Sequence, residues 1–153
     1  MVCCVLGATG FIGGQIARAA VERGWRVRAV RRRPGATGAI GDLPVAWAQA
    51  DLCDRAALIA AMRGCAVVFH AAAAYPQGSR HIARAVAEAR AEMMNVLDAA
   101  RAAGVARLIY TSSLTTLARR YTPGMALLDE QDVYRAGAAL VNAAAWMLRL
   151  RSA

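Results

Sequence analysis

The 153 residues are enough for one domain with a buried core, and a composition of 58% hydrophobic against 19% charged residues excludes a disordered chain. The formal net charge is +9 and all 19 basic residues are arginine, so these residues cannot supply a lysine amine to any reaction. No apolar run reaches the roughly 18 residues of a membrane span, and the start lacks the basic segment of a signal peptide. We therefore expect a cytoplasmic protein with no membrane partner.

In chain order, five short apolar runs predict strands, at residues 2–6, 25–30, 45–49, 66–70 and 107–111. Helical patterns stand between most of them, and Gly24, Gly64 and Gly104 follow these patterns where a left-handed glycine would end a helix. Asp54 is the predicted cap of the second helix. Residues 33–44 contain three glycines and two prolines and predict a loop in place of a helix.

This alternation of strands and helices indicates an α/β fold with a parallel sheet. With the motifs described below, we expect a doubly wound sheet of the Rossmann type, in three α/β/α layers with the strand order 3-2-1-4-5. We expect residues 1–113 to form this core. The alternation is lost beyond it, and residues 114–153 are expected to be a diverged or truncated tail without a substrate domain. The strand at 107–111 would then lie at a sheet edge, which favours self-association as a homodimer.

The first strand leads into a glycine series with the spacing G-x-x-G-x-x-G, formed by Gly7, Gly10 and Gly13. Gly7 would allow a tight turn, Gly10 would let a pyrophosphate approach the backbone, and Gly13 would let the helix pack closely on the sheet. The first N–H groups of that helix would face the anionic ligand. Between a strand and a helix, this series predicts a dinucleotide-binding turn.

The second strand ends in Arg31-Arg32-Arg33, where an acidic residue would favour NAD by accepting hydrogen bonds from the adenosine ribose. A guanidinium suits a 2′-phosphate instead, so we predict NADP as the cofactor, bound by Arg31, with NAD as the alternative. A solvated arginine run at a strand end is the plain alternative. Because most other arginines are spread thinly along the chain, nucleic acid is the least favoured partner.

The cysteines and histidines give little sign of a metal or nucleophilic site. Cys3, Cys4, Cys53 and Cys65 form no C-x-x-C pair, so we interpret them as buried small side chains rather than metal ligands or disulfides, and we predict no metal. His70, at the end of the fourth predicted strand, is interpreted as a packed residue rather than a base.

Four motifs come in the order of one family: GATGFIG at 7–13, Asp51-Leu52, VVFHAAA at 67–73 and NVLDAARAAGVARLIYTSS at 95–113. From residue 2 to about residue 113 the sequence resembles the extended short-chain dehydrogenase/reductases. Within that group it is most similar to the NAD-dependent epimerase/dehydratase and dihydroflavonol-reductase-like proteins.

The resemblance implies a cofactor site and one catalytic residue. Asp51 and Leu52 would lie near the adenine, and Ser113 would take the position of the catalytic serine. The motif residues expected to bind the cofactor are Gly7, Thr9, Gly10, Phe11, Ile12, Gly13, Asp51, Leu52, Ala71, Ala72 and Ala73.

The same resemblance calls for a Tyr-x-x-x-Lys pair, which this sequence lacks. In the family the tyrosine exchanges a proton with the substrate oxygen, and the lysine lowers the pKa of that tyrosine. After Ser113 the tyrosines are Tyr121 and Tyr134, and the residues four positions later are Met125 and Ala138.

We therefore predict an NAD(P)-binding protein that resembles the cofactor-binding half of an epimerase/dehydratase or reductase and is catalytically weak or inactive as this chain. The alternative is an NADP(H)-sensing module that acts through a protein partner, and a nucleic-acid-binding domain is third. The sequence leaves the substrate open, and with it the question of whether the chain is an enzyme.

Overall fold

The structure, a computed structural model, describes residues 1–72 and 82–112. The chain divides into two units, Met1–Tyr75 with Ala91–Thr111, and Pro76–Arg90 with Ser112–Ala153. The sheet and most of the helical residues described below belong to the first unit.

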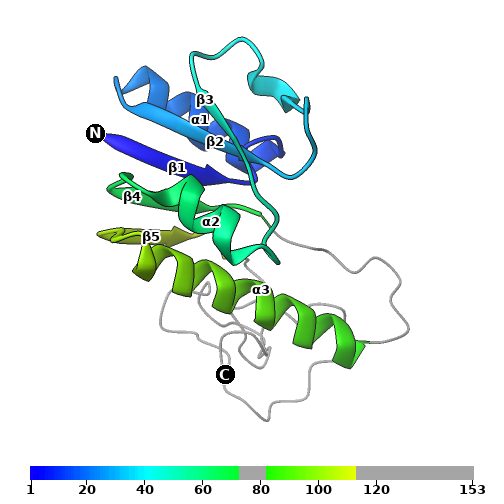
Figure 1. Ribbon diagram of the computed structural model, residues 1–153. Helices are drawn as coiled ribbons and strands as arrows, with labels where there is room; N and C mark the ends of the chain where they lie inside the picture. Colours follow the sequence, from blue (N-terminus) through cyan, green and yellow to red (C-terminus); the bar gives the residue numbers. More distant parts are fainter. Residues whose placement is uncertain (73–81, 113–153) are drawn as a thin grey trace, which may run out of the picture. The chain divides into compact units, whose positions relative to one another are not determined.

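Five parallel strands form one sheet in the order β3-β2-β1-β4-β5 (Figure 1). Their bounds are β1 Val2–Leu6, β2 Arg26–Arg31, β3 Ala46–Gln49, β4 Val67–His70 and β5 Arg107–Tyr110. The predicted α/β class and strand order are confirmed, and the predicted strand ends agree to within one residue. Since β1 pairs with both β2 and β4, the chain reverses its direction of winding beside β1.

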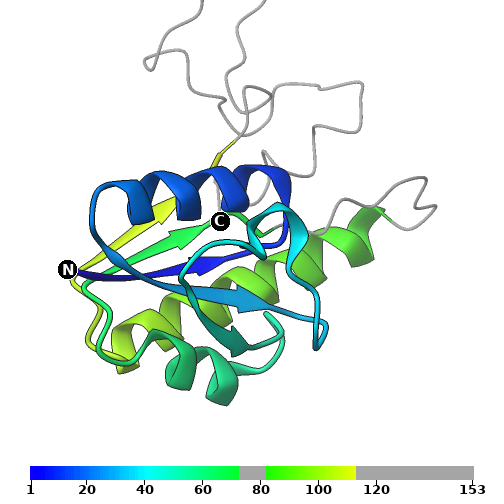
Figure 2. The same ribbon diagram turned by 90° about the horizontal axis from the view of Figure 1, so that it is seen from above.

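Helices cover both faces of this sheet, as Figure 2 shows. Helix α1 (Phe11–Glu22) lies on one face, together with the short 3-10 turn η1 (Gly38–Ile40). Helix α2 (Arg55–Met62) and the part of α3 (Ile82–Ala102) that belongs to the first unit lie on the other. The predicted three layers are confirmed. None of the helices described is long and apolar enough to cross a bilayer.

Alternating side chains of the strands divide the core into two clusters. Cys3 and Val5 of β1 pack with Ile40 on the α1 face, whereas Cys4 and Leu6 face the cluster formed with α2 and α3. Cys3, Cys4 and Cys65 are buried as expected. The prediction is wrong for Cys53, which is exposed because it lies in the turn between β3 and α2 rather than in an element that faces the core.

The helix ends follow the sequence signals. Gly24, Gly64 and Gly104 have φ values of +73°, +76° and +70° and come just after α1, α2 and α3. The Asp54 carboxylate accepts a hydrogen bond of 2.9 Å from the backbone N–H of Ala57 and caps α2. The predicted loop at 33–44 is also confirmed, with η1 as a single turn inside it.

Candidate functional site

The turn after β1 requires glycine at its first position. Gly7 has a φ of +79°, which side chains rarely tolerate, and a Cβ there would lie 2.8 Å from the backbone nitrogen of Ala72 after β4. A Cβ on Gly13, in the first turns of α1, would overlap the carbonyl oxygen of Gly7. These two glycines therefore let β1, α1 and the end of β4 approach one another closely.

The requirement for glycine at position 10 has a different origin. Gly10 is the N-cap of α1 with φ −84° and ψ 171°, an extended conformation that any residue adopts. Among the described atoms, a Cβ there would come within 4 Å of the carbonyl oxygen of Gly7 alone, at 3.3 Å. The backbone conformation does not require glycine here, and the contact with the Gly7 oxygen is much less severe than the overlaps at Gly7 and Gly13. Glycine at this position also leaves room for a ligand beside the start of α1.

The start of α1 also leaves its amides without a local partner from a side chain. The N-cap is a glycine, no side-chain cap hydrogen bond is formed, and the first turn contains no acidic residue. The first N–H groups of a helix lack intrahelical acceptors, and the helix dipole favours an anion beside them. This terminus can therefore receive a phosphate group.

A cavity of about 290 Å³ opens beside this turn, at the carboxyl ends of the first four strands. Its walls come from the residues that end or follow β1, β2, β3 and β4, with one side chain contributed by α3. The lining residues are Leu6, Gly7, Thr9, Gly10, Val30, Arg32, Ala50, Asp51, Leu52, Ala71, Ala72 and Glu92. In open α/β sheets this crevice, where the winding direction reverses, is where ligands bind.

Seven of the residues assigned to the cofactor from sequence line this cavity: Gly7, Thr9, Gly10, Asp51, Leu52, Ala71 and Ala72. Phe11 and Ile12 do not, and their side chains are 81% and 46% exposed. Gly13 lies beneath the turn and acts through packing. Ala73 and Ser113 fall outside the described residues.

The arginine run places Arg32, not Arg31, at the cavity. The Arg31 guanidinium lies over the Trp47 ring, 4.9 Å from its centroid, and donates a hydrogen bond of 3.3 Å to the carbonyl oxygen of Ala36. Arg31 is half-buried in this arrangement, whereas Arg32 is exposed. A guanidinium is therefore present at the predicted strand end, one residue later than predicted.

Sequence reasoning missed five lining residues. Leu6, Val30 and Ala50 end or directly follow predicted strands, so the strand ends could have found them. Arg32 stood beside the chosen arginine in the same run. Glu92 lies within a long helix, and no motif distinguishes it there.

The turn that follows β3 is fixed by short polar contacts. The Asp51 carboxylate accepts a hydrogen bond of 2.9 Å from the backbone N–H of Cys53, and the Asn95 side chain donates one of 3.0 Å to the carbonyl oxygen of Leu52. The Cys53 thiol approaches the Glu92 carboxylate, with 3.9 Å between Sγ and Oε1. Partial desolvation and the two carboxylates, Glu92 before Asp51, raise the pKa of the Cys53 thiol.

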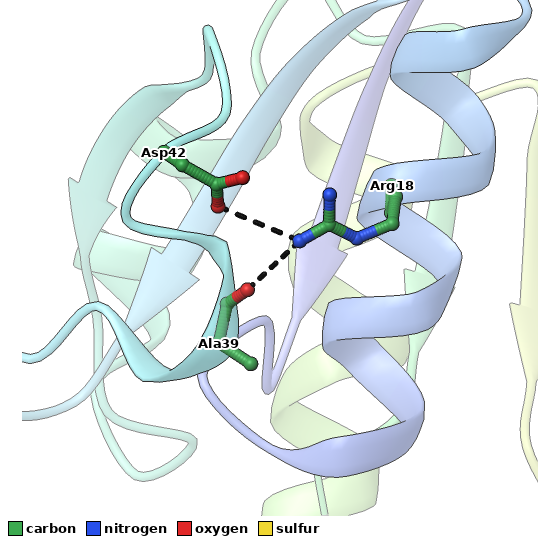
Figure 3. A network of polar contacts seen from close by, with 3 residues as sticks. All are labelled: Arg18, Ala39 and Asp42. Carbon is green, nitrogen blue, oxygen red and sulfur yellow. Dashed lines mark hydrogen bonds and ion pairs between the residues drawn. The ribbon is translucent and has the colours of Figure 1, made fainter.

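The loop between β2 and β3 supports the glycine turn from the α1 face. Arg18 of α1 donates a hydrogen bond of 3.0 Å to the carbonyl oxygen of Ala39 and forms an ion pair of 3.4 Å with Asp42 (Figure 3). Gly38 in this loop has a φ of +56°, and a Cβ there would overlap the carbonyl oxygen of Thr9. Because Thr9 lines the cavity, the loop packs directly behind part of its wall.

His70 ends β4 as a buried residue, with 3% of its surface exposed. Its ring lies 5.3 Å from that of Tyr110, and among the described residues no group hydrogen-bonds its Nδ1. Burial lowers the pKa of His70 to about 4. The imidazole is therefore neutral near pH 7, as expected for a packed residue, and it is a weak base.

Together, the parallel sheet, the glycine turn and the cavity at the reversal of winding define a Rossmann-type dinucleotide-binding fold. The family model described as "NAD dependent epimerase/dehydratase family" matches residues 3–134. The chain belongs to this family.

Two curated relatives show the extent of the similarity. A putative dihydroflavonol 4-reductase of Synechocystis sp. is 34% identical over 113 residues, which are 74% of this chain and 33% of the relative. Cinnamoyl-CoA reductase 1 of Oryza sativa is 36% identical over 119 residues, 72% of this chain and 33% of the relative. The chain thus spans about a third of the length of these relatives.

Two similar solved structures contain a cofactor. An NADPH-dependent quinone oxidoreductase of Escherichia coli, complexed with NADPH, is 27% identical with a TM-score of 0.58, covering 73% of this chain and 36% of that one. A short-chain dehydrogenase/reductase superfamily protein of Agrobacterium tumefaciens, with bound NAD, is 27% identical with a TM-score of 0.62, covering 76% and 34%. Both forms of the cofactor thus occur among the neighbours of this fold.

Proposed function

We propose that the chain binds NADP(H) in the cavity at the carboxyl ends of β1–β4, as the cofactor-binding half of an epimerase/dehydratase- or reductase-type protein. The observation that carries this proposal is Gly10, which lines the cavity, has an extended backbone that any residue can adopt, and would be crowded by described atoms far less than Gly7 or Gly13 if it carried a Cβ. The pyrophosphate lies against Gly10 and the first amides of α1. Ala71 and Ala72 border the same ligand from the end of β4.

Arg32 supports the preference for NADP over NAD. It follows β2, where the adenosine ribose of a dinucleotide lies in this fold, and its guanidinium can bind a 2′-phosphate. The role first assigned to Arg31 passes to Arg32, because Arg31 is engaged with Trp47 and Ala36. NAD is the alternative cofactor, since it differs from NADP only in lacking the 2′-phosphate that Arg32 would bind, and Asp51 is expected near the adenine with either one.

We further propose that this chain alone turns over substrate weakly or not at all. A bound nicotinamide cofactor would supply hydride transfer, and Ser113, at the position of the family's catalytic serine, would polarise the substrate carbonyl. Neither Tyr121 nor Tyr134 is followed four residues later by the lysine that would lower the pKa of the tyrosine. The sequence contains no lysine to complete the tyrosine–lysine pair. The retained cavity together with the missing pair favours an NADP(H)-sensing module as the second candidate function.

The cofactor proposal is tested by calorimetric titration of the full chain with NADP⁺ and NAD⁺ at one ionic strength. We expect micromolar NADP⁺ binding, its loss in Gly10→Val, and a weakening of about 10- to 100-fold in Arg32→Ala, with NAD⁺ binding little changed by the arginine substitution. Arg33→Ala removes the same charge from the next, exposed position and serves as the matched control.

Two results would contradict the proposal. If neither dinucleotide binds the unaltered chain, the cavity is not a cofactor site. If Arg33→Ala weakens NADP⁺ binding as much as Arg32→Ala, the arginine run acts only through general charge, and the assignment of the 2′-phosphate to Arg32 fails.

A further inference from the structure

The edge of the sheet opposite the cavity is formed by the connections that lead from a helix into a strand. Parallel strands joined by helices return each of these connections to the end at which the strands begin. Three of them are described: residues 23–25 lead into β2, 63–66 into β4 and 103–106 into β5. Because the cavity lies at the carboxyl ends of the strands, a ligand bound there leaves this edge free.

Backbone hydrogen bonds join the starts of the strands in one row, on the side marked N in Figure 1. The Arg26 N–H donates to the carbonyl oxygen of Met1 at 3.0 Å, and the Arg107 N–H donates to that of Ala66 at 3.2 Å. Between them, the Ala66 N–H donates to the carbonyl oxygen of Val2 at 2.9 Å. Since neighbouring strands lie about 4.8 Å apart, Arg26 and Arg107 stand at the two ends of a row of about 15 Å.

Five arginines that are far apart in sequence gather at this edge. They lie in the three connections or at the element ends next to them, and all are exposed: Arg23, Arg26, Arg63, Arg101 and Arg107. The connections contain no Asp or Glu. The carboxylates closest to them in sequence are Glu22, which ends α1, and Asp98, which forms an ion pair of 3.5 Å with Arg55. We name this surface the arginine edge.

The fold itself accounts for two of the five arginines. Arg23 donates a hydrogen bond of 3.1 Å to a carbonyl oxygen of its own helix, and Arg101 lies in the last turn of α3, where the helix dipole favours a cation. Arg26 and Arg107 begin strands and serve no helix end. The guanidinium groups of Arg26, Arg63 and Arg107 form no hydrogen bond or ion pair with any described residue, so they are available to a partner.

The connections that carry the arginine edge are sterically open. A Cβ added to Gly24, Gly64 or Gly104, one in each connection, would meet no described atom within 4 Å. At Gly7 and Gly13, beside the cavity, an added Cβ would instead collide with the backbone. The arginine edge is therefore open as well as positively charged, and it can receive an anionic partner.

Apolar side chains lie beside these arginines. Met1 is 55% exposed, and Trp25, directly before Arg26, is half-buried against Phe69, with the two ring centroids 6.4 Å apart. Arg, Met and Trp are enriched where proteins bind proteins, whereas surfaces that bind nucleic acid are more polar. The composition of the arginine edge therefore favours a protein partner over nucleic acid.

We propose that the arginine edge binds an acidic segment of a partner protein, in which Asp and Glu side chains flank a short apolar stretch. The carboxylates accept hydrogen bonds from Arg26, Arg63 and Arg107, and the apolar stretch packs on Met1. The planar guanidinium binds a carboxylate in a fixed geometry, so several such pairs along one row add specificity. The chain then presents a partner surface at one edge of the sheet and the cavity at the other.

The probe is a labelled peptide of about 8 residues, long enough when extended to span the row, with Asp and Glu on both sides of a pair of leucines. A second peptide carries Asn and Gln in place of Asp and Glu, and a single-stranded oligonucleotide carries the same negative charge as the first. Each is titrated with the full chain at low salt and followed by fluorescence anisotropy. We expect the acidic peptide to bind at least about tenfold more tightly than the neutral peptide, to bind more tightly than the oligonucleotide, and to weaken as salt is added.

Arg26→Gln and Arg107→Gln each remove one charge from an end of the row. We expect each to weaken binding of the acidic peptide by about 3- to 5-fold, and the double variant to weaken it by about tenfold or more, since the two positions do not touch. Arg33→Gln is the matched control, because it removes the same charge from an exposed residue beyond the other end of β2. It is expected to change the affinity by less than about twofold. Urea unfolding establishes that all variants keep the stability of the unaltered chain.

Three outcomes overturn the inference. If the acidic peptide does not bind, or binds no better than the neutral one, the arginine edge does not recognise carboxylates. If Arg33→Gln weakens the acidic peptide as much as Arg26→Gln does, the net charge of the chain is responsible and not this edge. If the oligonucleotide binds as tightly as the peptide or more tightly, with a steep dependence on salt, the edge belongs to nucleic acid and not to a protein partner.

Discussion

At the scale of single residues, a side chain at position 7 and one at position 10 would have different effects, although both glycines belong to the same motif. A Cβ on Gly7 would be strained by the positive φ and crowded by Ala72, while a Cβ on Gly10 would be close only to one carbonyl oxygen. We expect Gly7→Ala to lower the free energy of unfolding by about 2 kcal/mol or more, from backbone strain and crowding together. Gly10→Ala should change it by less than about 1 kcal/mol and act on ligand binding instead.

Urea denaturation of the two variants measures this difference, and a dinucleotide titration follows for whichever variant remains folded. Equal losses of stability would show that position 10 is restricted by the protein itself. The physical reason given for the proposed pyrophosphate site would then be lost.

His70 predicts a dependence of stability on pH. Burial lowers its pKa in the folded chain to about 4 from an ordinary value of 6.5. Between these values the unfolded chain binds more protons than the folded one, so stability falls as the pH is lowered through this window. For this one group the loss between pH 7 and pH 4.5 is about 2 to 3 kcal/mol.

The contribution of His70 is isolated by comparison with His70→Phe, because carboxylates also titrate in this range. Urea unfolding at pH 7 and at pH 4.5 should show a smaller loss of stability in the variant than in the unaltered chain. The same loss in both proteins would mean that the imidazole is protonated as readily in the folded state as in the unfolded one.

At the scale of elements, the loop between β2 and β3 links α1 to the cavity. Gly35 and Gly38 both have positive φ values, +76° and +56°, but only a Cβ on Gly38 would strike another residue, Thr9. We expect Gly35→Ala to cost about 1 kcal/mol of stability from backbone strain alone. Gly38→Ala should cost more and also weaken NADP⁺ binding several-fold, since it displaces the loop from the cavity wall.

Thermal unfolding and calorimetry of these two variants separate strain from crowding. If Gly35→Ala weakens NADP⁺ binding as much as Gly38→Ala does, the loop acts on the site through its general rigidity and not through its contact with Thr9. The Arg18 contacts shown in Figure 3 would then be the more important link.

The elements also show what a sequence can and cannot predict. Short apolar runs and the glycines at helix ends predicted the strands and a parallel sheet, since parallel strands joined by helices leave few arrangements. The strand order followed from the Rossmann-type fold that the glycine turn and the family resemblance indicate. The arginine run was ambiguous because three identical neighbours do not reveal which side chain faces the sheet and which leaves it. Glu92 was not predictable, because its place at the cavity depends on the packing of α3 against the turn at 51–53, far away in sequence.

At the scale of the whole molecule, the edge of the sheet predicts association. Within the described residues β5 pairs only with β4, and its side chains Ile109 and Tyr110 are 40% and 36% exposed. An edge strand with apolar side chains favours pairing with another chain. We expect the chain to dimerise at micromolar concentration and Ile109→Lys to weaken the dimer about tenfold, as measured by sedimentation equilibrium. A monomer at high concentration would contradict this.

Every described residue that lines the cavity lies in one of the two units of the chain, from Leu6 to Ala72 or at Glu92. The sequence-predicted catalytic position, Ser113, belongs to the other unit. If the cofactor binds in the cavity as proposed, a substitution in the second unit can change a reaction without changing the described residues that hold the cofactor.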